Sequence, residues 1–184
     1  TSEEEFNKLS KIIDSIGSKK ILLDEYEHDE IFCLTSHLPQ FLSFMTKDLT
    51  PKNIDDEFFA NAFRLDNSNH DIWDDIFKLN EENLEESYLD FFDNLENNIT
   101  NLDEDKLDLD IKYNKANFDL HYLEEHFPAI FFRFLIVKSY LEIVPEECYD
   151  FTGTGFADFT SITSILSYEK IDELIIKNKN KILK

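Results

Sequence analysis

The scarcity of helix-breaking residues constrains the fold of this chain more than any other feature of its sequence. Glycine occurs three times and proline four times in 184 residues, while phenylalanine alone occurs 18 times. Because glycine and proline punctuate local structure, so few of them favour long helices over a sheet-rich fold. The aromatic content indicates a substantial buried core, and the length suits one sizeable core or two small ones. We therefore expect a mainly α-helical chain.

Apolar residues recur at spacings of three and four along much of the sequence. The longest such stripe runs over residues 29–49 and predicts one long helix. A turn and a second helix are expected over residues 50–65, and one or two further amphipathic helices over residues 72–95. Residues 127–144 are apolar around most of a helical circumference, which is typical of a central buried helix. These stretches indicate a helical bundle-like domain, with a last helix from about Tyr168.

The N-terminal residues have a different pattern. Ser2 and Glu5 form a capping box that begins a helix, and Gly17 stands where a helix-ending glycine belongs. Residues 19–25 then predict a short apolar strand. A helix, a glycine and a strand make the last αβ unit of many α/β domains, so we expect residues 1–27 to be a remnant of such a unit. A strand that pairs elsewhere in the fold is the open alternative.

Charge and cysteine content bound the partners and the compartment. The formal net charge of −22 makes nucleic acids and anionic membranes poor partners. The most apolar run is interrupted by Arg133, Lys138 and Glu142, which favours a buried helix over a membrane span. Cys33 and Cys148 lie in apolar surroundings, which is typical of reduced thiols rather than a disulfide framework. We therefore expect a soluble, cytoplasmic protein.

The stretch "EHDEIFCLTSHLPQFLSF", residues 27–44, places a proline inside a helical stripe. Proline in a helix interior costs about 3 kcal/mol and leaves a carbonyl of the preceding turn unpaired. Two interpretations of His37 are open: it lines a substrate site, or it satisfies the carbonyl that Pro39 leaves unpaired. The neighbouring His28-Asp29 pair either orients a ligand or reflects an acidic residue that caps the helix N-terminus.

This stretch resembles the start of the helical C-terminal domain of prephenate dehydrogenases. That family has a His-Asp pair followed by Ser-His-Leu-Pro-His; the matching residues here are His28-Asp29 and Ser36-His37-Leu38-Pro39, with Gln40 in place of the second histidine. The preceding residues 1–27 are similar to the last helix and strand of the family's nucleotide-binding domain. The resemblance continues in register to about residue 100.

The second half of the chain echoes the first. "EEHFPAIFFRFL" is similar to "TSHLPQFLSFM", and "GTGFADFTSI" resembles the family's Gly-Phe-Arg-Asp signature. Ala157 and Ser161 stand where the signature has arginines, while Arg64 aligns with the second of those arginines in the first half. We therefore expect an internal duplication, with repeats over residues 28–100 and 121–184 and a linker over 96–117. The open alternative is that two amphipathic helices with His-x-Pro merely look alike.

The resemblance implies a function. Prephenate dehydrogenases are oxidoreductases of tyrosine biosynthesis that oxidatively decarboxylate prephenate to 4-hydroxyphenylpyruvate with NAD or NADP. Their nucleotide-binding domain holds the cofactor and the catalytic histidine, while the helical domain dimerises and lends an arginine to the substrate carboxylates. We therefore assign residues 28–184 to the helical C-terminal domain. In this chain alone we expect no catalytic residue, no cofactor site and no turnover.

Four residues are candidates for binding prephenate or tyrosine: Arg64, His37, Ser36 and His28. Prephenate is a dianion, and a planar guanidinium can bind a carboxylate with two hydrogen bonds. Arg64 is the strongest candidate because it aligns with an arginine of the family signature. The chain has one other arginine, Arg133.

Other polar clusters have simpler explanations. His70, Asp71, Asp74 and Asp75 are interpreted as a solvated helix face, so we expect no metal site. Cys33 has no matched base beside it in the sequence and is not expected to be a catalytic thiol.

The resemblance leaves two assemblies and two functions open. The chain forms a homodimer, or its two repeats pack within one chain as a monomeric pseudo-dimer. The alternative to a substrate-binding region is a non-enzymatic acidic helical module for interaction or dimerisation, which kept the fold and lost the site.

Overall fold

The structure is a computed structural model that describes residues 2–52, 57–101 and 126–164. All regular elements in these ranges are helical, which confirms the mainly α prediction. The α-helices are α1 (Glu3–Ser15), α2 (Glu25–Phe32), α3 (Leu38–Thr46), α4 (Glu57–Ala62), α5 (His70–Leu79), α6 (Glu81–Asn101), α8 (Phe127–Leu141) and α9 (Thr154–Thr160). A π-helical turn, η1 (Cys33–His37), joins α2 to α3, and 3₁₀ turns form η2 (Lys47–Leu49), η3 (Arg64–Asn67), η4 (Glu146–Phe151) and η5 (Ser161–Ser164).

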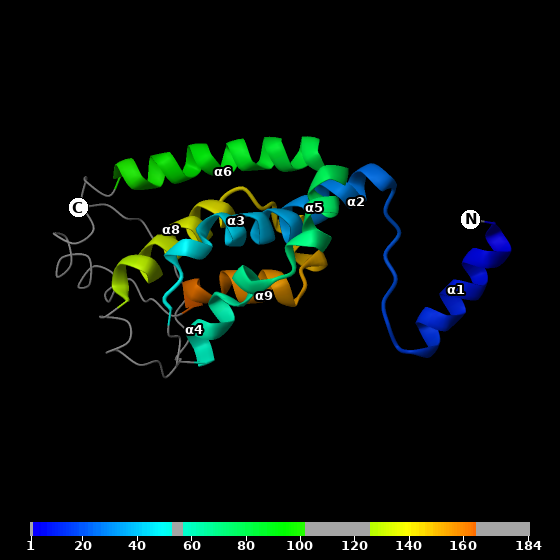
Figure 1. The fold of residues 1–184 in the computed structure, drawn as a ribbon. Helices are drawn as coiled ribbons and strands as arrows, with labels where there is room; N and C mark the ends of the chain where they lie inside the picture. The colour runs from blue at the N-terminus through cyan, green and yellow to red at the C-terminus, as the bar shows by residue number, and fades with distance from the viewer. Residues whose placement is uncertain (1, 53–56, 102–125, 165–184) are drawn as a thin grey trace.

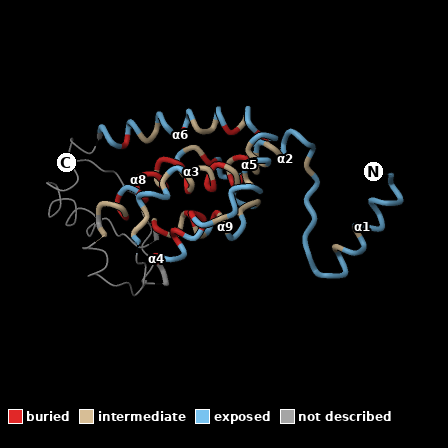
Figure 2. The backbone as a smooth tube through the Cα atoms, viewed as in Figure 1, coloured by how far each residue is buried: buried red, intermediate tan, exposed pale blue. Residues whose placement is uncertain are grey.

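The helices other than α1 pack into one bundle. The long α6 lies along α8, and α3 contacts α8 on one side and α9 on the other (Figure 1). Buried positions concentrate on α3, α8 and α9, in the middle of this bundle (Figure 2). The bundle therefore has one core, which lies where α3, α8 and α9 meet.

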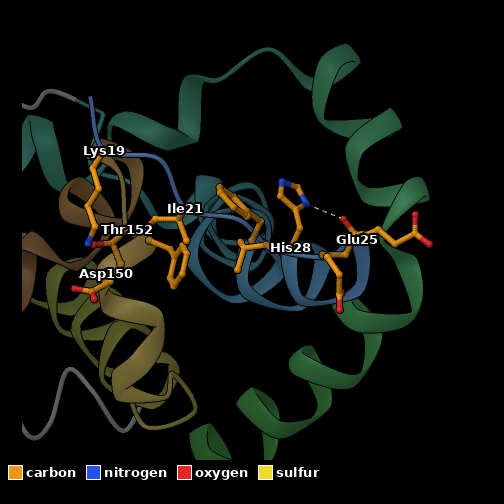
Figure 3. Close-up of a pocket in the computed structure, with 11 residues that line it drawn as sticks. Lys19, Ile21, Glu25, His28, Asp150 and Thr152 are labelled. Atoms are coloured by element: carbon orange, nitrogen blue, oxygen red, sulfur yellow. Dashed lines mark hydrogen bonds and ion pairs between the residues drawn. The ribbon is translucent and has the colours of Figure 1, made fainter. Parts of the chain in front are cut away.

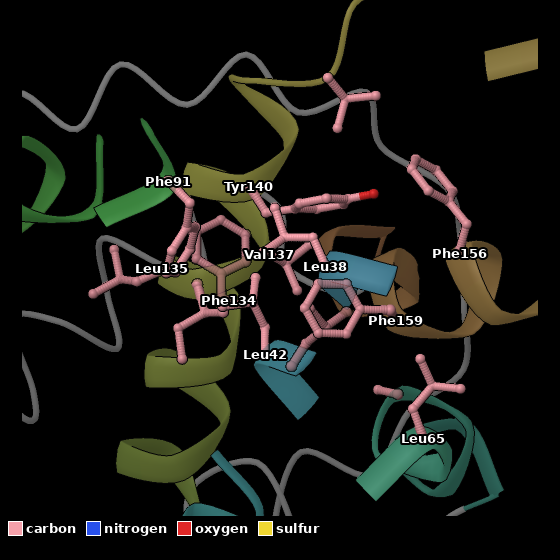
Figure 4. Close-up of a cluster of buried hydrophobic side chains, with 14 of the residues drawn as sticks. Leu38, Leu42, Leu65, Phe91, Phe134, Leu135, Val137, Tyr140, Phe156 and Phe159 are labelled. Atoms are coloured by element: carbon pink, nitrogen blue, oxygen red, sulfur yellow. The ribbon is translucent and has the colours of Figure 1, made fainter. Parts of the chain in front are cut away.

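Apolar side chains from distant parts of the sequence fill this core. Leu38 and Leu42 of α3 meet Phe134 and Val137 of α8, and Phe159 of α9 closes the cluster (Figure 4). Each such buried side chain contributes about 1.5–3 kcal/mol relative to its exposed state. The central buried helix expected over residues 127–144 is thus confirmed as α8. Among the described residues, no helix has the length and apolar character that a membrane span requires.

The expected strand over residues 19–25 is wrong. The helix before it forms as predicted: Ser2 and Glu5 make the capping box, and Gly17 has a positive φ of 74°. Residues 18–24 then run as an unpaired connection to α2, because no strand lies beside them within the described ranges (Figure 1). The side chain of Asp24 accepts hydrogen bonds from the backbone N–H groups of Tyr26 and Glu27, so a helix begins at residue 25. The αβ remnant is therefore a helix and an extended segment.

The expected linker over residues 96–117 starts too early, because α6 continues to Asn101. Asn98 is buried, and its amide donates to Ser139 Oγ at 3.0 Å and to Glu142 Oε2 at 2.8 Å. Lys138 Nζ donates to the Asn98 Oδ1 at 2.6 Å. These bonds hold the last turns of α6 on α8. The rest of the expected linker and the helix expected from Tyr168 lie outside the described residues.

Candidate functional site

Pro39 lies near the start of α3, directly after the π-helical turn. In this turn the Leu38 N–H donates to the carbonyl of Cys33, five residues back instead of four. The next bond in this register would reach the Leu34 carbonyl, but Pro39 has no N–H to donate. The hydroxyl of Tyr140, on α8, donates to that carbonyl at 2.6 Å. Tyr140, and not His37, therefore satisfies the group that the proline leaves unpaired.

His37 is held by an asparagine network instead. Asn80 Nδ2 donates to the Asp29 carbonyl at 2.7 Å and lies 3.0 Å from His37 Nδ1, which must then be the acceptor. Asn83 in turn donates to the Asn80 side-chain oxygen at 2.7 Å. Burial lowers the pKa of His37, an effect that the charge of Asp29 opposes. The imidazole is therefore held neutral, with its proton on Nε2.

His28 and Asp29 interact with each other at the surface of α2. Nδ1 of His28 lies 3.0 Å from an oxygen of Asp29, and the imidazole stacks on Phe32 with ring centroids 4.4 Å apart. Asp29 is not the helix cap that one interpretation assigned to it, because Asp24 occupies that position.

An open cleft of about 740 Å³ separates the start of α2 from the turn at residues 150–152. Figure 3 shows Lys19, Asp150 and Thr152 at one end of this cleft and Glu25 at the other, with His28 beside Glu25. The wide cleft, as we call it, is lined by Lys19, Ile21, Leu23, Asp24, Glu25, His28, Asp29, Phe32, Asp150, Phe151 and Thr152. Its four carboxylates outnumber its one lysine, so its electrostatic potential disfavours a dianion.

A smaller cavity of about 160 Å³, the ring pocket, adjoins the wide cleft and shares Phe32 and Phe151 with it. No charged residue lines it, and most of its wall is aromatic or apolar. Its lining residues are Phe32, Thr35, Ser36, Gln40, Leu65, Trp73, Phe151, Gly153, Gly155 and Phe156. These residues come from η1, α3, η3, α5, η4 and α9, so segments from both halves of the sequence build the pocket.

Gln40 is a buried polar residue in the lining of the ring pocket. The side chain is 1% exposed, and its Nε2 donates to the Leu65 carbonyl at 2.8 Å, which fixes the orientation of the amide. The amide oxygen has no hydrogen-bond partner among the described residues. A buried acceptor without a partner costs about 1–3 kcal/mol, so a group that donates a hydrogen bond would be stabilised here. The ring pocket therefore suits an uncharged ring that carries such a donor.

Arg64 lies beside the ring pocket and is already paired. Its Nε and one terminal nitrogen both lie 2.5 Å from Oδ2 of Asp158, and its side chain is half exposed. Arg64 directly precedes Leu65, and Asp158 lies two positions after Phe156; both Leu65 and Phe156 line the ring pocket. A ligand carboxylate that reached Arg64 would have to compete with Asp158.

The second arginine, Arg133, is buried in the core. It donates to Asp66 Oδ1 at 2.6 Å and to Ser43 Oγ at 3.2 Å, and the Thr50 hydroxyl also bonds to Asp66. Burial lowers the pKa of Arg133, and the nearby carboxylate of Asp66 counteracts that effect. Arg133 therefore holds the structure together and has no access to a ligand.

The four predicted site residues thus fall at neighbouring places rather than in one cluster. Ser36 lines the ring pocket, and His28 lines the wide cleft. His37 contacts Trp73, a ring-pocket residue, with ring centroids 6.3 Å apart and close to perpendicular planes. Sequence reasoning noted Gln40 only as a departure from the family pattern. That departure, an amide in place of a histidine, was the sequence signal that could have pointed to Gln40.

His70 and Cys33, for which we expect no metal-binding or catalytic role, have structural partners. His70 stacks on Phe44 with centroids 3.8 Å apart. Burial raises the pKa of the Cys33 thiol to about 11, although a contact with Ser87 opposes the shift, so the sulfur is not a thiolate at neutral pH. Within the described ranges, no group of three or more histidine, cysteine or acidic side chains is arranged to hold a metal ion.

Comparisons with known proteins show which family part of the chain resembles. Residues 24–113 match the family model described as prephenate dehydrogenase, dimerization domain. Neither curated proteins nor solved structures give a match to the chain. The match starts at the N-cap of α2 and spans the ring-pocket residues that precede residue 100, together with Arg64. Residues 24–113 are therefore similar to the dimerization domain of prephenate dehydrogenases.

Proposed function

We propose that this chain is the dimerization and substrate-binding region of a prephenate dehydrogenase. Such an enzyme oxidatively decarboxylates prephenate to 4-hydroxyphenylpyruvate. The match of residues 24–113 to the family model supports the assignment to a dimerization domain. The observation that carries the substrate-binding role is the unpartnered oxygen of Gln40 in a pocket walled by aromatic rings. The pocket's volume of about 160 Å³ leaves room for the ring of the ligand and not for the whole ligand.

The two N-terminal helices do not suit the dinucleotide cofactor that the family uses. Dinucleotide phosphates bind at helix N-termini, where backbone N–H groups point towards them. Here α1 and α2 both begin with capping boxes and acidic first turns, which would repel a pyrophosphate. In the proposed enzyme this region therefore binds and orients the substrate, and redox chemistry belongs to another domain.

In this proposal the ring and the carboxylates of the ligand have separate binding partners. The ring enters the ring pocket, where its hydroxyl group donates to Gln40 and the Ser36 hydroxyl lies in the same lining. A carboxylate reaches Arg64 by displacing Asp158. Arginine can form two hydrogen bonds with a carboxylate, so this exchange replaces one carboxylate by another at modest net cost.

Calorimetric titration of the chain with prephenate and with tyrosine tests the proposal. We expect binding by the unaltered chain and its loss in Arg64→Ala. Lys11→Ala is the matched control, because it also removes one positive charge but lies on α1, which has no buried residues. Equal weakening by both substitutions would indicate a general charge effect and would contradict a carboxylate contact at Arg64.

A second function is favoured by the state of the arginines. Arg64 and Arg133 are both paired with aspartates, and the wide cleft is acidic. A module with these properties suits a basic protein partner better than a dianion. Binding of a lysine-rich peptide that weakens as salt rises, together with no heat of binding for prephenate, would favour this interaction module.

A further inference from the structure

Two segments of the chain contain the same parts in the same order. In the first, His37 precedes α3, whose second residue is Pro39, and α4 and η3 follow. In the second, His126 precedes α8, whose second residue is Pro128, and α9 and η5 follow. We call these the first segment (38–67) and the second segment (127–164). Only the first lies entirely within the part of the chain that matches the family model.

The two segments pack against each other in a reciprocal way. Within the first segment α3 contacts η3, and within the second α8 contacts η5. Between them, η3 packs on α9 and α4 packs on η5, while α3 meets α8 and α4 meets α9 (Figure 1). Such paired contacts are what an approximate two-fold axis produces, because each part then meets the counterpart of its own neighbour. The symmetry is approximate, since α3 also packs on α9 while α8 and α4 do not pack to the same extent.

Ionic and aromatic contacts join the segments at this junction. Arg64 of the first segment pairs with Asp158 of the second, and Arg133 of the second pairs with Asp66 of the first. The Arg133 guanidinium also lies over one ring from each segment, 4.8 Å from the centroid of Phe63 and 5.5 Å from that of Phe159. Each arginine therefore bridges the two segments.

The junction is also where the core is most completely buried. Phe59 of α4, Phe134 of α8 and Phe159 of α9 are each 0% exposed. The buried faces of the first segment are thus covered by the second segment of the same chain.

We infer that the first and second segments are the two halves of one dimerization interface, folded together within a single chain as a pseudo-dimer. This inference goes beyond the proposed function and does not depend on which ligand binds. It replaces the second subunit that the family name suggests with the chain's own second segment.

Charge reversals at Arg64 and Asp158 test whether this pairing lies within one chain. Arg64→Asp and Asp158→Arg each place two like charges together, and we expect each to lower the melting temperature by about 2–4 °C. The double variant Arg64→Asp/Asp158→Arg restores the opposite charges and should regain most of the loss. The decisive sample is an equimolar mixture of the two single variants, unfolded in denaturant and refolded together.

A pairing within one chain predicts that the mixture melts like the two single variants, because neither chain can supply the missing charge to the other. Sedimentation should give the mass of one chain, 21.8 kDa. A mixture that regains the melting temperature of the unaltered protein would overturn the inference, since the charges would then pair between chains. Single variants that melt normally would also overturn it, because the bridge between the segments would then be absent. A two-chain mass would contradict the inference that the second segment takes the place of a second subunit.

Discussion

The hydroxyl of Tyr140 donates a hydrogen bond to the backbone carbonyl of Leu34, 106 residues earlier in the sequence. That carbonyl belongs to the π-helical turn, where Pro39 has no N–H to offer. Burial raises the pKa of Tyr140 well above its ordinary value, so the phenol keeps the proton that it donates. One side chain of α8 thus permits a proline in the middle of a buried helical segment.

Tyr140→Phe should destabilise the protein by about 1–3 kcal/mol, because it leaves the Leu34 carbonyl buried and unpaired. Denaturant unfolding followed by circular dichroism measures the change. Tyr149→Phe is the matched control: Tyr149 is 43% exposed, and the substitution keeps its ring beside Phe156. If both variants unfolded at the same denaturant concentration, the hydrogen bond would not have the role that we give it.

Pro39→Ala should reduce the effect of losing the tyrosine hydroxyl. Alanine supplies a backbone N–H that can donate to the Leu34 carbonyl, so Tyr140→Phe should cost about 1 kcal/mol less in the Pro39→Ala background. The four unfolding free energies of this double-mutant cycle give the coupling directly. Additive effects would show that the proline and the tyrosine act independently.

Asp158→Asn should strengthen the binding of a carboxylate ligand if Arg64 contacts it. The substitution removes the charge that competes for the guanidinium while keeping the size of the side chain, and a gain of about 1.4 kcal/mol corresponds to tenfold tighter binding. Calorimetric titration with prephenate provides the measurement. Unchanged or weaker binding would show that Asp158 does not compete with the ligand.

His37 should make the fold sensitive to mild acid. Burial lowers its pKa in the folded state, so the unfolded chain takes up a proton first as the pH falls below about 6.5. The stabilising contribution of neutral His37 is therefore fully present above that pH and is lost as the pH falls towards and below the folded pKa.

Between about pH 7.5 and pH 5.5, the unaltered protein should thus lose more stability than His37→Gln, whose amide oxygen can still accept from Asn80. The comparison uses unfolding free energies of both proteins across this range, so that carboxylate titrations common to both cancel. Parallel pH profiles would rule out His37 as the titrating group.

The elements that depend on local chemistry were predictable from the sequence. The capping box of Ser2 and Glu5 and the glycine at position 17 define α1, because caps involve residues only a few positions apart. The strand over residues 19–25 failed for the opposite reason. A strand needs a partner that local sequence does not specify, and the cap at Asp24 made residue 25 helical instead.

The details of the site depend on contacts between distant residues. Apolar spacing predicted a helix over residues 29–49, but its π-helical turn is stabilised by Tyr140, which no local pattern connects to it. Arg64 was identified by its alignment with a family motif. Arg64 pairs with Asp158, 94 residues later, and this pairing limits how readily Arg64 can bind a ligand. The sequence around either residue alone does not predict the pairing.

The side-chain amide of Gln40 offers the most direct test of the substrate-binding account. Its NMR signal can be followed as prephenate is added, with the buried amide of Asn98, which does not line the ring pocket, as the internal reference. The account predicts that the Gln40 signal shifts and saturates with the same affinity that calorimetry gives, while the Asn98 signal stays in place. A Gln40 signal that remains fixed while residues of the wide cleft respond would contradict it.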